Sequence, residues 1–253
     1  MSMLPKLIGL YREAGLEPLT GYNSHHFGNY GDAPFTKFLR GPHLVAIAGL
    51  ALQEVMLLEH FANYMSPRNI LIIGNAYGWS TIALALIFPK AAVLAIDPGA
   101  EGNDVTNEIA RKAGLSAVAA LGYSPRDVGT LCAQHLSGPA DLVLIDAVHD
   151  NPSVWNDFAA CWAQSQASTI VLLHDVIQWN LVDAVRRIRA EHALEGRILT
   201  RTASGMAVLW KTAPQEFQDY VGVFTEDPNI FRGYRRLVLD SFVDKLSQPV
   251  NKL

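Results

Sequence analysis

A short segment with two glycines four residues apart could bind a nucleotide-like ligand. Residues 74–80 read Gly-Asn-Ala-Tyr-Gly-Trp-Ser and directly follow an apolar run that ends at Ile73. Glycine lets the backbone turn tightly and approach a ligand closely, and the free N–H groups at the start of a following helix would face that ligand. The dinucleotide fingerprint G-x-G-x-x-G is not met, because Ala76 stands at its second glycine. A plain strand-to-helix turn is the alternative.

An acidic residue, Asp97, stands 19 residues after Gly78 and ends the next apolar run. A carboxylate in that place can accept hydrogen bonds from the two hydroxyl groups of a ribose. Dinucleotide-binding folds carry such an acid about 20 residues after the glycine loop. A solvated turn aspartate before Pro98 is the alternative. Together, the loop and the acid favour a ligand that contains ribose.

Three further polar groups each follow a later apolar run. They are Gly122-Tyr123-Ser124, the segment from Asp146 to Asp150, and His174-Asp175. In an open α/β sheet, ligands bind beyond the carboxyl ends of the strands. Five polar groups at five predicted strand ends therefore indicate one shared site. The alternative for the acidic residues is that they only cap helices or bind backbone at the strand ends.

The elements that must position these groups alternate regularly from residue 69 onward. Apolar runs predict strands at Asn69–Ile73, Ala92–Ile96, Ala117–Leu121, Asp141–Ile145 and Thr169–Leu173, and helical spacing fills the segments between them. Apolar strands that alternate with helices indicate a parallel sheet covered on both faces. Two further strands, Arg197–Thr202 and Met206–Lys211, are too close for a helix between them and predict an antiparallel hairpin. We expect an α/β, Rossmann-like, doubly wound and mostly parallel seven-stranded sheet with this C-terminal hairpin.

The rest of the chain predicts segments on either side of that sheet. The spacing of apolar residues predicts a helix over Leu44–Met65, and Pro67 ends it. We expect an N-terminal segment at 1–43, the ligand-binding domain at 44–212 and a C-terminal helical cap at 213–253 that could contact a partner.

The N-terminal segment holds a cluster of turn-forming and aromatic residues from Asn23 to Asp32. Such a composition is typical of a loop. The adjacent His25 and His26 would point apart in most backbones, which disfavours a metal site. A loop packed over the domain is one interpretation, and a lid whose aromatic side chains cover the substrate is the other.

The loop 74–80, Asp97, the strand end Leu144-Ile145-Asp146 and the closing hairpin together resemble class I S-adenosylmethionine-dependent methyltransferases, over about residues 44–211. The loop is similar to the G-x-x-x-G-[YW]-S form of catechol O-methyltransferase-like enzymes. The resemblance implies S-adenosylmethionine as the cofactor. One departure is Ile72, which stands where the family usually has an acidic residue, so contacts to the methionine part must come from elsewhere. The implied cofactor-binding residues are Gly74, Asn75, Ala76, Tyr77, Gly78 and Ser80 near methionine and ribose, Asp97 on the ribose, Gly122, Tyr123 and Ser124 along the adenine, and Asp146.

The D-x-x-H segment from Asp146 to His149 resembles metal-dependent sugar and small-molecule O-methyltransferases. In those enzymes the aspartates bind the metal and the histidine is the base. The strand order of the family makes the predicted strands Asp141–Ile145 and Thr169–Leu173 neighbours, about 5 Å apart. Asp146, His174 and Asp175 are therefore the implied ligands of a divalent ion such as Mg²⁺ or Mn²⁺. Such an ion lowers the pKa of a bound hydroxyl. His149 and Asp146 are therefore the candidate catalytic residues, with His149 taking the proton.

Composition limits the partners and the location. The 253 residues carry a net charge of −4 and 50% hydrophobic residues, and no basic stripe is visible, which argues against nucleic acid as a partner. No apolar run reaches the 18 residues of a membrane span, and no signal-peptide core is visible. Cys132 and Cys161 form no C-x-x-C pair. We expect a cytoplasmic protein that binds no membrane and forms a homodimer.

These observations predict an S-adenosylmethionine-dependent methyltransferase that transfers a methyl group to a hydroxyl of a small molecule, a sugar or a phenolic metabolite. Two alternatives stay open at this point. One is an NAD(P)-dependent oxidoreductase on a Rossmann sheet, which the missing G-x-G-x-x-G disfavours. The other is a non-catalytic protein that binds the cofactor, for which Ile72 is the main support.

Overall fold

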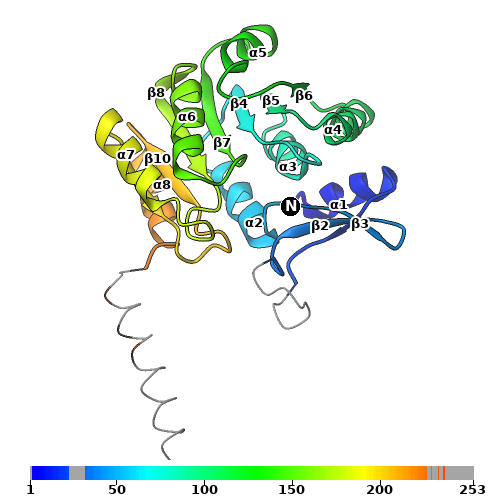
Figure 1. Cartoon of the computed structure of the whole chain (residues 1–253), viewed down its shortest axis with the longest axis horizontal. Helices are drawn as coiled ribbons and strands as arrows, with labels where there is room; N and C mark the ends of the chain where they lie inside the picture. Colours follow the sequence, from blue (N-terminus) through cyan, green and yellow to red (C-terminus); the bar gives the residue numbers. More distant parts are fainter. Residues whose placement is uncertain (1, 23–31, 227–228, 230–232, 234–235, 237–253) are drawn as a thin grey trace, which may run out of the picture.

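The fold is built around a seven-stranded sheet (Figure 1). The computed structural model describes residues 2–22, 32–226, 229, 233 and 236. The strands lie in the order β6-β5-β4-β7-β8-β10-β9. Their bounds are β4 (Asn69–Ile73), β5 (Ala92–Asp97), β6 (Ala117–Leu121), β7 (Ala140–Ile145), β8 (Ser165–Leu173), β9 (Glu195–Ile198) and β10 (Ala207–Trp210).

Strands β4 to β8 pair in parallel. Strand β10 enters between β8 and β9 and is antiparallel to both. The predicted Rossmann-like, mostly parallel sheet with a C-terminal antiparallel hairpin is therefore confirmed. Because β4 lies at the centre of the five parallel strands with β5 and β7 on either side, the loops after these three strands open at the same edge.

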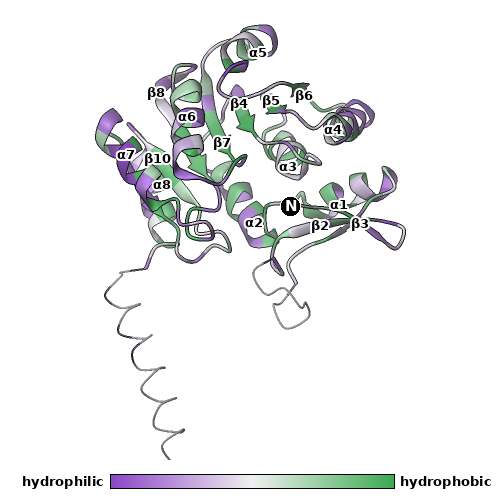
Figure 2. Ribbon diagram, viewed as in Figure 1, coloured by the Kyte–Doolittle hydropathy of each residue, from purple (hydrophilic) through white to green (hydrophobic). Residues whose placement is uncertain are grey.

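Successive side chains of the strands point to opposite faces of the sheet, and each face is covered by its own helices. In β4, Ile70 and Ile72 belong to one hydrophobic cluster, and Leu71 and Ile73 belong to the other. All four are at most 2% exposed, and each such burial stabilises the fold by about 1.5–3 kcal/mol. Figure 2 shows the hydrophobic colour gathered in the interior, as on β7, and polar colours mainly on outer helices such as α7.

The first cluster lies under α1 (Leu4–Glu13), α2 (Leu52–Phe61), α3 (Trp79–Ile87), α4 (Ala100–Ala113) and α8 (Gln215–Gly222). The second lies under α5 (Val128–His135), α6 (Asn151–Trp162) and α7 (Val182–His192). Cys132 and Cys161 are free and buried in this second cluster. Among the described residues, no helix is both long enough and apolar enough to cross a membrane.

The N-terminal part differs from its prediction. Strands β1 (Glu17–Leu19), β2 (Thr36–Arg40) and β3 (His43–Gly49) form a second, antiparallel sheet. The helix predicted over Leu44–Met65 is therefore wrong in its first half, and α2 begins only at Leu52. Pairing with β2 decides the conformation of residues 43–49, because tertiary context overrides the helical spacing of a short apolar run. Helix α1 was not predicted either.

The division at residues 43 and 213 stays a prediction, although the N-terminal sheet crosses residue 43. Leu7 of α1 and Phe38 of β2 belong to the same hydrophobic cluster as the parallel sheet. The cluster with His25 and His26, and most of the tail after residue 226, lie outside the described residues.

Candidate active site

A cavity of about 480 Å³ opens at the carboxyl ends of β4, β5, β7 and β8. Four of the five polar groups predicted at strand ends line it, together with residues of the N-terminal part. The loops after the strands contribute Gly74, Asn75, Ala76, Ser80, Asp97, Pro98, Asp146, Ala147, Val148, His149, His174, Asp175, Gln178 and Trp179, and the N-terminal part contributes Asp32, Phe35 and Gly49.

The loop after β4 can take its shape only with glycine at two places. Gly74 and Gly78 have φ angles of 92° and 78°, in the left-handed region that favours glycine. A Cβ atom on Gly74 would lie 2.0 Å from the carbonyl oxygen of Asp146, and one on Gly78 would lie 2.1 Å from Oγ1 of Thr106. Ala76 between them is also left-handed, with φ 45°, a strained conformation of the kind found at ligand sites.

Asp97 holds this loop by its backbone. Its Oδ2 accepts hydrogen bonds from the N–H groups of Asn75 (2.8 Å) and Ala76 (3.0 Å), and its Oδ1 accepts one from Gly99 (2.6 Å). A carboxylate offers about four acceptor positions, so the ribose-binding role predicted for Asp97 stays compatible with these contacts. The sequence pattern did not show that the same carboxylate also shapes the loop.

Two other loop residues act as supports. The side chain of Asn75 is buried and donates hydrogen bonds to Oγ1 of Thr106 (2.9 Å) and Oδ1 of Asn103 (3.1 Å). The carbonyl of Tyr77 accepts a hydrogen bond from the hydroxyl of Tyr11 in α1 (2.8 Å). Neither Tyr77 nor Gly78 lines the cavity, whereas Ser80 does.

The residues predicted along the adenine, Gly122, Tyr123 and Ser124, follow β6 and do not line the cavity. Tyr123 is 55% exposed, and the guanidinium of Arg126 lies over its ring, 4.9 Å from the centroid. The adenine role of these residues stays a prediction.

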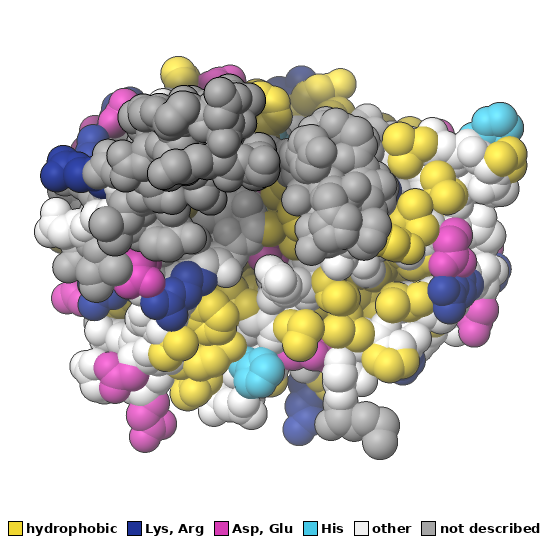
Figure 3. Space-filling model, turned by 90° about the horizontal axis from the view of Figure 1, so that it is seen from below, with side chains coloured by type: hydrophobic (Ala, Val, Ile, Leu, Met, Phe, Trp, Pro, Cys, Tyr) yellow, Lys and Arg dark blue, Asp and Glu magenta, His cyan; other side chains and the backbone are white. Residues whose placement is uncertain are grey.

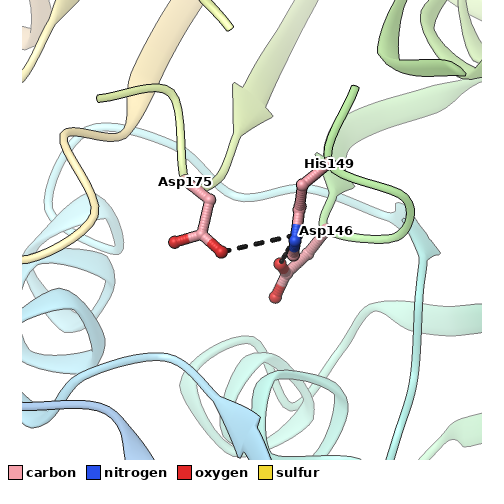
Figure 4. A group of neighbouring side chains, drawn as sticks. All are labelled: Asp146, His149 and Asp175. Carbon is pink, nitrogen blue, oxygen red and sulfur yellow. Dashed lines mark hydrogen bonds and ion pairs between the residues drawn. The ribbon is translucent and has the colours of Figure 1, made fainter. Parts of the chain in front are cut away.

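At the other end of the cavity, Asp146, His149 and Asp175 face one another (Figure 4). Nε2 of His149 lies 3.4 Å from Oδ1 of Asp146 and 3.4 Å from Oδ2 of Asp175. One potential ligand atom from each of the three lies within 4.8 Å of the others. Oδ1 of Asp175 is buried and accepts no hydrogen bond from the described residues, although Nδ1 of His174 lies 3.4 Å from it. The backbone of Asp175 is left-handed, with φ 57°, a strained conformation of the kind found at ligand sites.

His174 has a different environment from the one expected of a metal ligand. Its Nε2 lies 2.9 Å from Oε2 of Glu54, and its Nδ1 lies 3.0 Å from Oδ1 of Asp146. Both ring nitrogens are engaged, and Nδ1 also lies 3.4 Å from Oδ1 of Asp175, so both histidines lie beside the two aspartates. The metal-ligand role of His174 stays a prediction. His174 lies behind Asp146 and is 4% exposed.

Burial and neighbouring charges together shift the pKa values of the side chains in this cluster. Burial disfavours the charged form of His174, but Asp146 and Glu54 outweigh it and raise the pKa of His174 well above its usual value. Burial likewise opposes ionisation of Asp146, but His174 and His149 outweigh it and lower the pKa of Asp146. Burial raises the pKa of Asp175 despite the attraction of His174.

Sequence reasoning missed two residues of this region. Glu54 is a buried acid inside an apolar stretch of α2, and that isolated charge was the signal that could have found it. Trp179 is 57% exposed and stacks on His149, with ring centroids 5.7 Å apart and the planes at 20°. Trp179 lines the cavity beside His149, and nothing in the sequence indicated its place.

Comparison with known proteins agrees with this geometry. Residues 71–176 match the profile of a family described as a methyltransferase domain. Among curated proteins, no relative matches the sequence.

Two solved structures share the fold. Cofactor-bound Rv0187 from MTB is 20% identical and has a TM-score of 0.57, over 83% of this chain and 90% of that one. The O-methyltransferase TomG from Streptomyces achromogenes, in complex with SAM, is 18% identical and has a TM-score of 0.55, over 84% and 91%. The sheet order and the family match lead to one conclusion: the chain is similar to a methyltransferase domain over residues 71–176 and shares the fold of these two solved structures.

Proposed function

We propose that this methyltransferase acts on a hydroxyl oxygen of an uncharged small molecule, with His149 as the general base. The observation that carries the proposal is the position of His149. Its Nε2 lies between the carboxylates of Asp146 and Asp175, on the wall of the same cavity as the glycine loop and Asp97. The base and the cofactor loop therefore face one common space.

In the proposed reaction, the hydroxyl oxygen of the acceptor attacks the methyl carbon of the sulfonium. The carbon–sulfur bond breaks, S-adenosylhomocysteine leaves, and the hydroxyl proton passes to Nε2 of His149. Nε2 carries no proton before this step, and the carboxylates of Asp146 and Asp175, each 3.4 Å from it, stabilise the imidazolium that the step forms. Holding the two reactants in line contributes most of the rate, several kcal/mol of the barrier, and the base adds about 10²–10⁴-fold.

The site also fits a divalent cation. Three carboxylates, those of Glu54, Asp146 and Asp175, lie within 3.4 Å of the imidazole of His174, and Oδ1 of Asp175 accepts no hydrogen bond from the described residues. Asp146 and Asp175 would hold the ion, since Mg²⁺ needs only one or two carboxylates besides water and substrate oxygens. When bound, such an ion would lower the pKa of the acceptor hydroxyl.

The wall of the cavity supports an uncharged acceptor. Four aspartates and two histidines line it among the residues that the structure describes, and neither Lys nor Arg does. An acidic wall attracts the positive sulfonium of the cofactor and repels phosphate and carboxylate groups. Val148 and Trp179, which are 59% and 57% exposed, form an apolar part of the wall. A phenolic ring or a sugar could stack there.

The test is a screen of uncharged phenols and sugars, in which release of S-adenosylhomocysteine is followed with and without EDTA. We expect His149→Ala to lower turnover on the best acceptor by about 10²–10⁴-fold and to leave the Kd for S-adenosylhomocysteine unchanged. The matched control is His135→Ala, because His135 is exposed at the end of α5.

Turnover that survives His149→Ala would rule out His149 as the general base. Turnover insensitive to EDTA would rule out a divalent cation in the reaction, and His149 would remain the proposed base. A thermal shift with NAD(H) but none with S-adenosylhomocysteine would favour the oxidoreductase alternative, since a ligand at 100 times its Kd stabilises the protein by about 2.7 kcal/mol.

A further inference from the structure

A buried acid outside the matched methyltransferase segment reaches the centre of the site. Glu54 lies in α2, 17 residues before residue 71 where the family match begins. Its side chain is 0% exposed. An acid is rarely buried completely unless it is paired, so its partners indicate its function.

Glu54 accepts hydrogen bonds from three separate parts of the chain. Its Oε1 accepts from the backbone N–H and from the hydroxyl of Ser204, at 2.9 and 2.5 Å, just before β10. Its Oε2 accepts from the N–H of Ala51 at 2.9 Å and faces Nε2 of His174 at 2.9 Å. Both oxygens are saturated in a fixed geometry, so Glu54 is a rigid anchor and not a free titrating group.

The opposite nitrogen of the same imidazole contacts the reaction site. Nδ1 of His174 lies 3.0 Å from Oδ1 of Asp146, and the edge of the ring of Phe35 packs against the imidazole, with centroids 5.8 Å apart. The imidazole is therefore clamped at both nitrogens and on one side. Because its orientation follows from Glu54, the direction of its Nδ1–H toward Asp146 does so too.

We propose that Glu54 is a positioning residue that acts through His174 to fix the carboxylate of Asp146 at the reaction site. Groups that hold a ligand or catalytic carboxylate from behind typically change metal affinity or activity by 10–100-fold when they are removed. Glu54 links α2 and the start of β10 to the end of β7, so the site depends on elements outside residues 71–176. This inference rests on the proposed role of Asp146.

The test compares Glu54→Gln with Ser204→Ala. Glutamine has the same shape but a single acceptor oxygen, so it cannot satisfy both sides of the anchor. Ser204→Ala removes a hydrogen bond from the same carboxylate on the side away from His174. We expect Glu54→Gln to weaken Mn²⁺ binding, measured by calorimetry, and turnover on an identified acceptor by 10–100-fold. We expect Ser204→Ala to change either quantity by less than twofold, and neither variant to change the Kd for S-adenosylhomocysteine.

A crystal structure of Glu54→Gln and a double-mutant cycle test whether Glu54 positions Asp146 or only stabilises the fold. We expect the Asp146 carboxylate to shift away from its position in the wild type, and Glu54→Gln to have no further effect on Mn²⁺ binding or turnover in a His174→Gln background. An unmoved Asp146 carboxylate, or effects that simply add, would overturn the inference and leave Glu54 as a stabilising residue only. Wild-type protein that binds no Mn²⁺ would contradict the proposed metal site, and the position of Asp146 would still decide the role of Glu54.

Discussion

At the scale of single residues, the partners of each buried side chain determine its role in the site. His174 and His149 are both near Asp146, yet they have different partners. His174 lies between Glu54 and Asp146 and is buried. His149 faces the cavity under Trp179. A buried histidine with both ring nitrogens engaged supports the site, whereas a histidine whose side chain reaches the cavity can exchange a proton with the substrate.

Because the carboxylates of Asp146 and Glu54 are paired in the folded protein, we expect the protein to lose stability in acid. The pKa of Asp146 and that of Glu54 are lowered in the folded protein from their usual values of 3.8 and 4.5, despite burial. The unfolded chain therefore binds more protons in acid, so the stabilisation by these groups is present above about pH 4.5 and is lost as the pH falls toward their folded pKa values. The raised pKa of His174 acts oppositely: its stabilisation is complete below about pH 6.5 and is lost only on the alkaline side.

Urea unfolding of the wild type and of Asp146→Asn between pH 2 and 7 measures the effect. We expect Asp146→Asn to lower the free energy of unfolding by about 3 kcal/mol at pH 7, the cost of breaking a buried ion pair, and this difference to decrease only as the pH falls below 3.8. Parallel curves over the whole range would show that Asp146 does not change its pKa on folding.

At the scale of elements, the cofactor loop is held in place by the helix that follows the next strand. Gly102 in the first turn of α4 touches the loop so closely that a Cβ atom would lie 1.8 Å from the carbonyl oxygen of Ala76. Neither composition nor spacing marked this glycine. The close approach of α4 permits Asn103 and Thr106 to contact Asn75, so the loop and the helix form one unit.

We therefore expect Gly102→Ala to displace the loop and to raise the Kd for S-adenosylhomocysteine at least 10-fold, as measured by calorimetry. The matched control is Gly9→Ala in α1, where nothing lies within 4 Å of an added Cβ atom. That control should keep the Kd and stabilise the protein by about 0.4–1 kcal/mol. Equal Kd values in Gly102→Ala and the wild type would show that the loop tolerates the displacement.

At the scale of the whole molecule, the N-terminal part and the parallel sheet share one hydrophobic cluster. Leu7, Tyr11, Leu16 and Phe38 are at most 1% exposed, and Tyr11 stacks on Phe38 with centroids 4.9 Å apart. Strand β3 pairs with β2.

On the face seen in Figure 3, basic side chains are scattered among acidic and hydrophobic ones in the described part of the chain.

Removal of residues 1–43 is therefore expected to prevent folding and not only to uncover the site. Four large buried side chains contribute about 1.5–3 kcal/mol each, a sum comparable to the 5–15 kcal/mol of a typical domain, and β3 loses its partner β2. We expect the chain 44–253 to show no cooperative transition in urea, followed by circular dichroism. A truncated chain that unfolds at the wild-type urea midpoint would instead support a separable lid over the site.

Much of the parallel sheet was predictable because its signals are local. Strands β4 and β6 begin and end where their apolar runs do, Asn69–Ile73 and Ala117–Leu121. Gly74 and Gly78 follow β4 as a glycine loop should, and their positive φ angles explain why no other residue type stands there. Strand ends of a parallel sheet meet at one edge, so Asp97, Asp146 and Asp175 could be assigned to one site.

The tertiary structure alone decided the contacts between segments that are distant in the chain. Residues 43–49 have helical spacing but form β3, because pairing with β2 is decided in space. His174 and His149 look alike in the sequence, yet only His174 contacts Glu54, which lies 120 residues before it. Periodicity and turn residues encode local structure, whereas the compensation of a buried charge depends on which distant groups the fold brings within hydrogen-bonding distance.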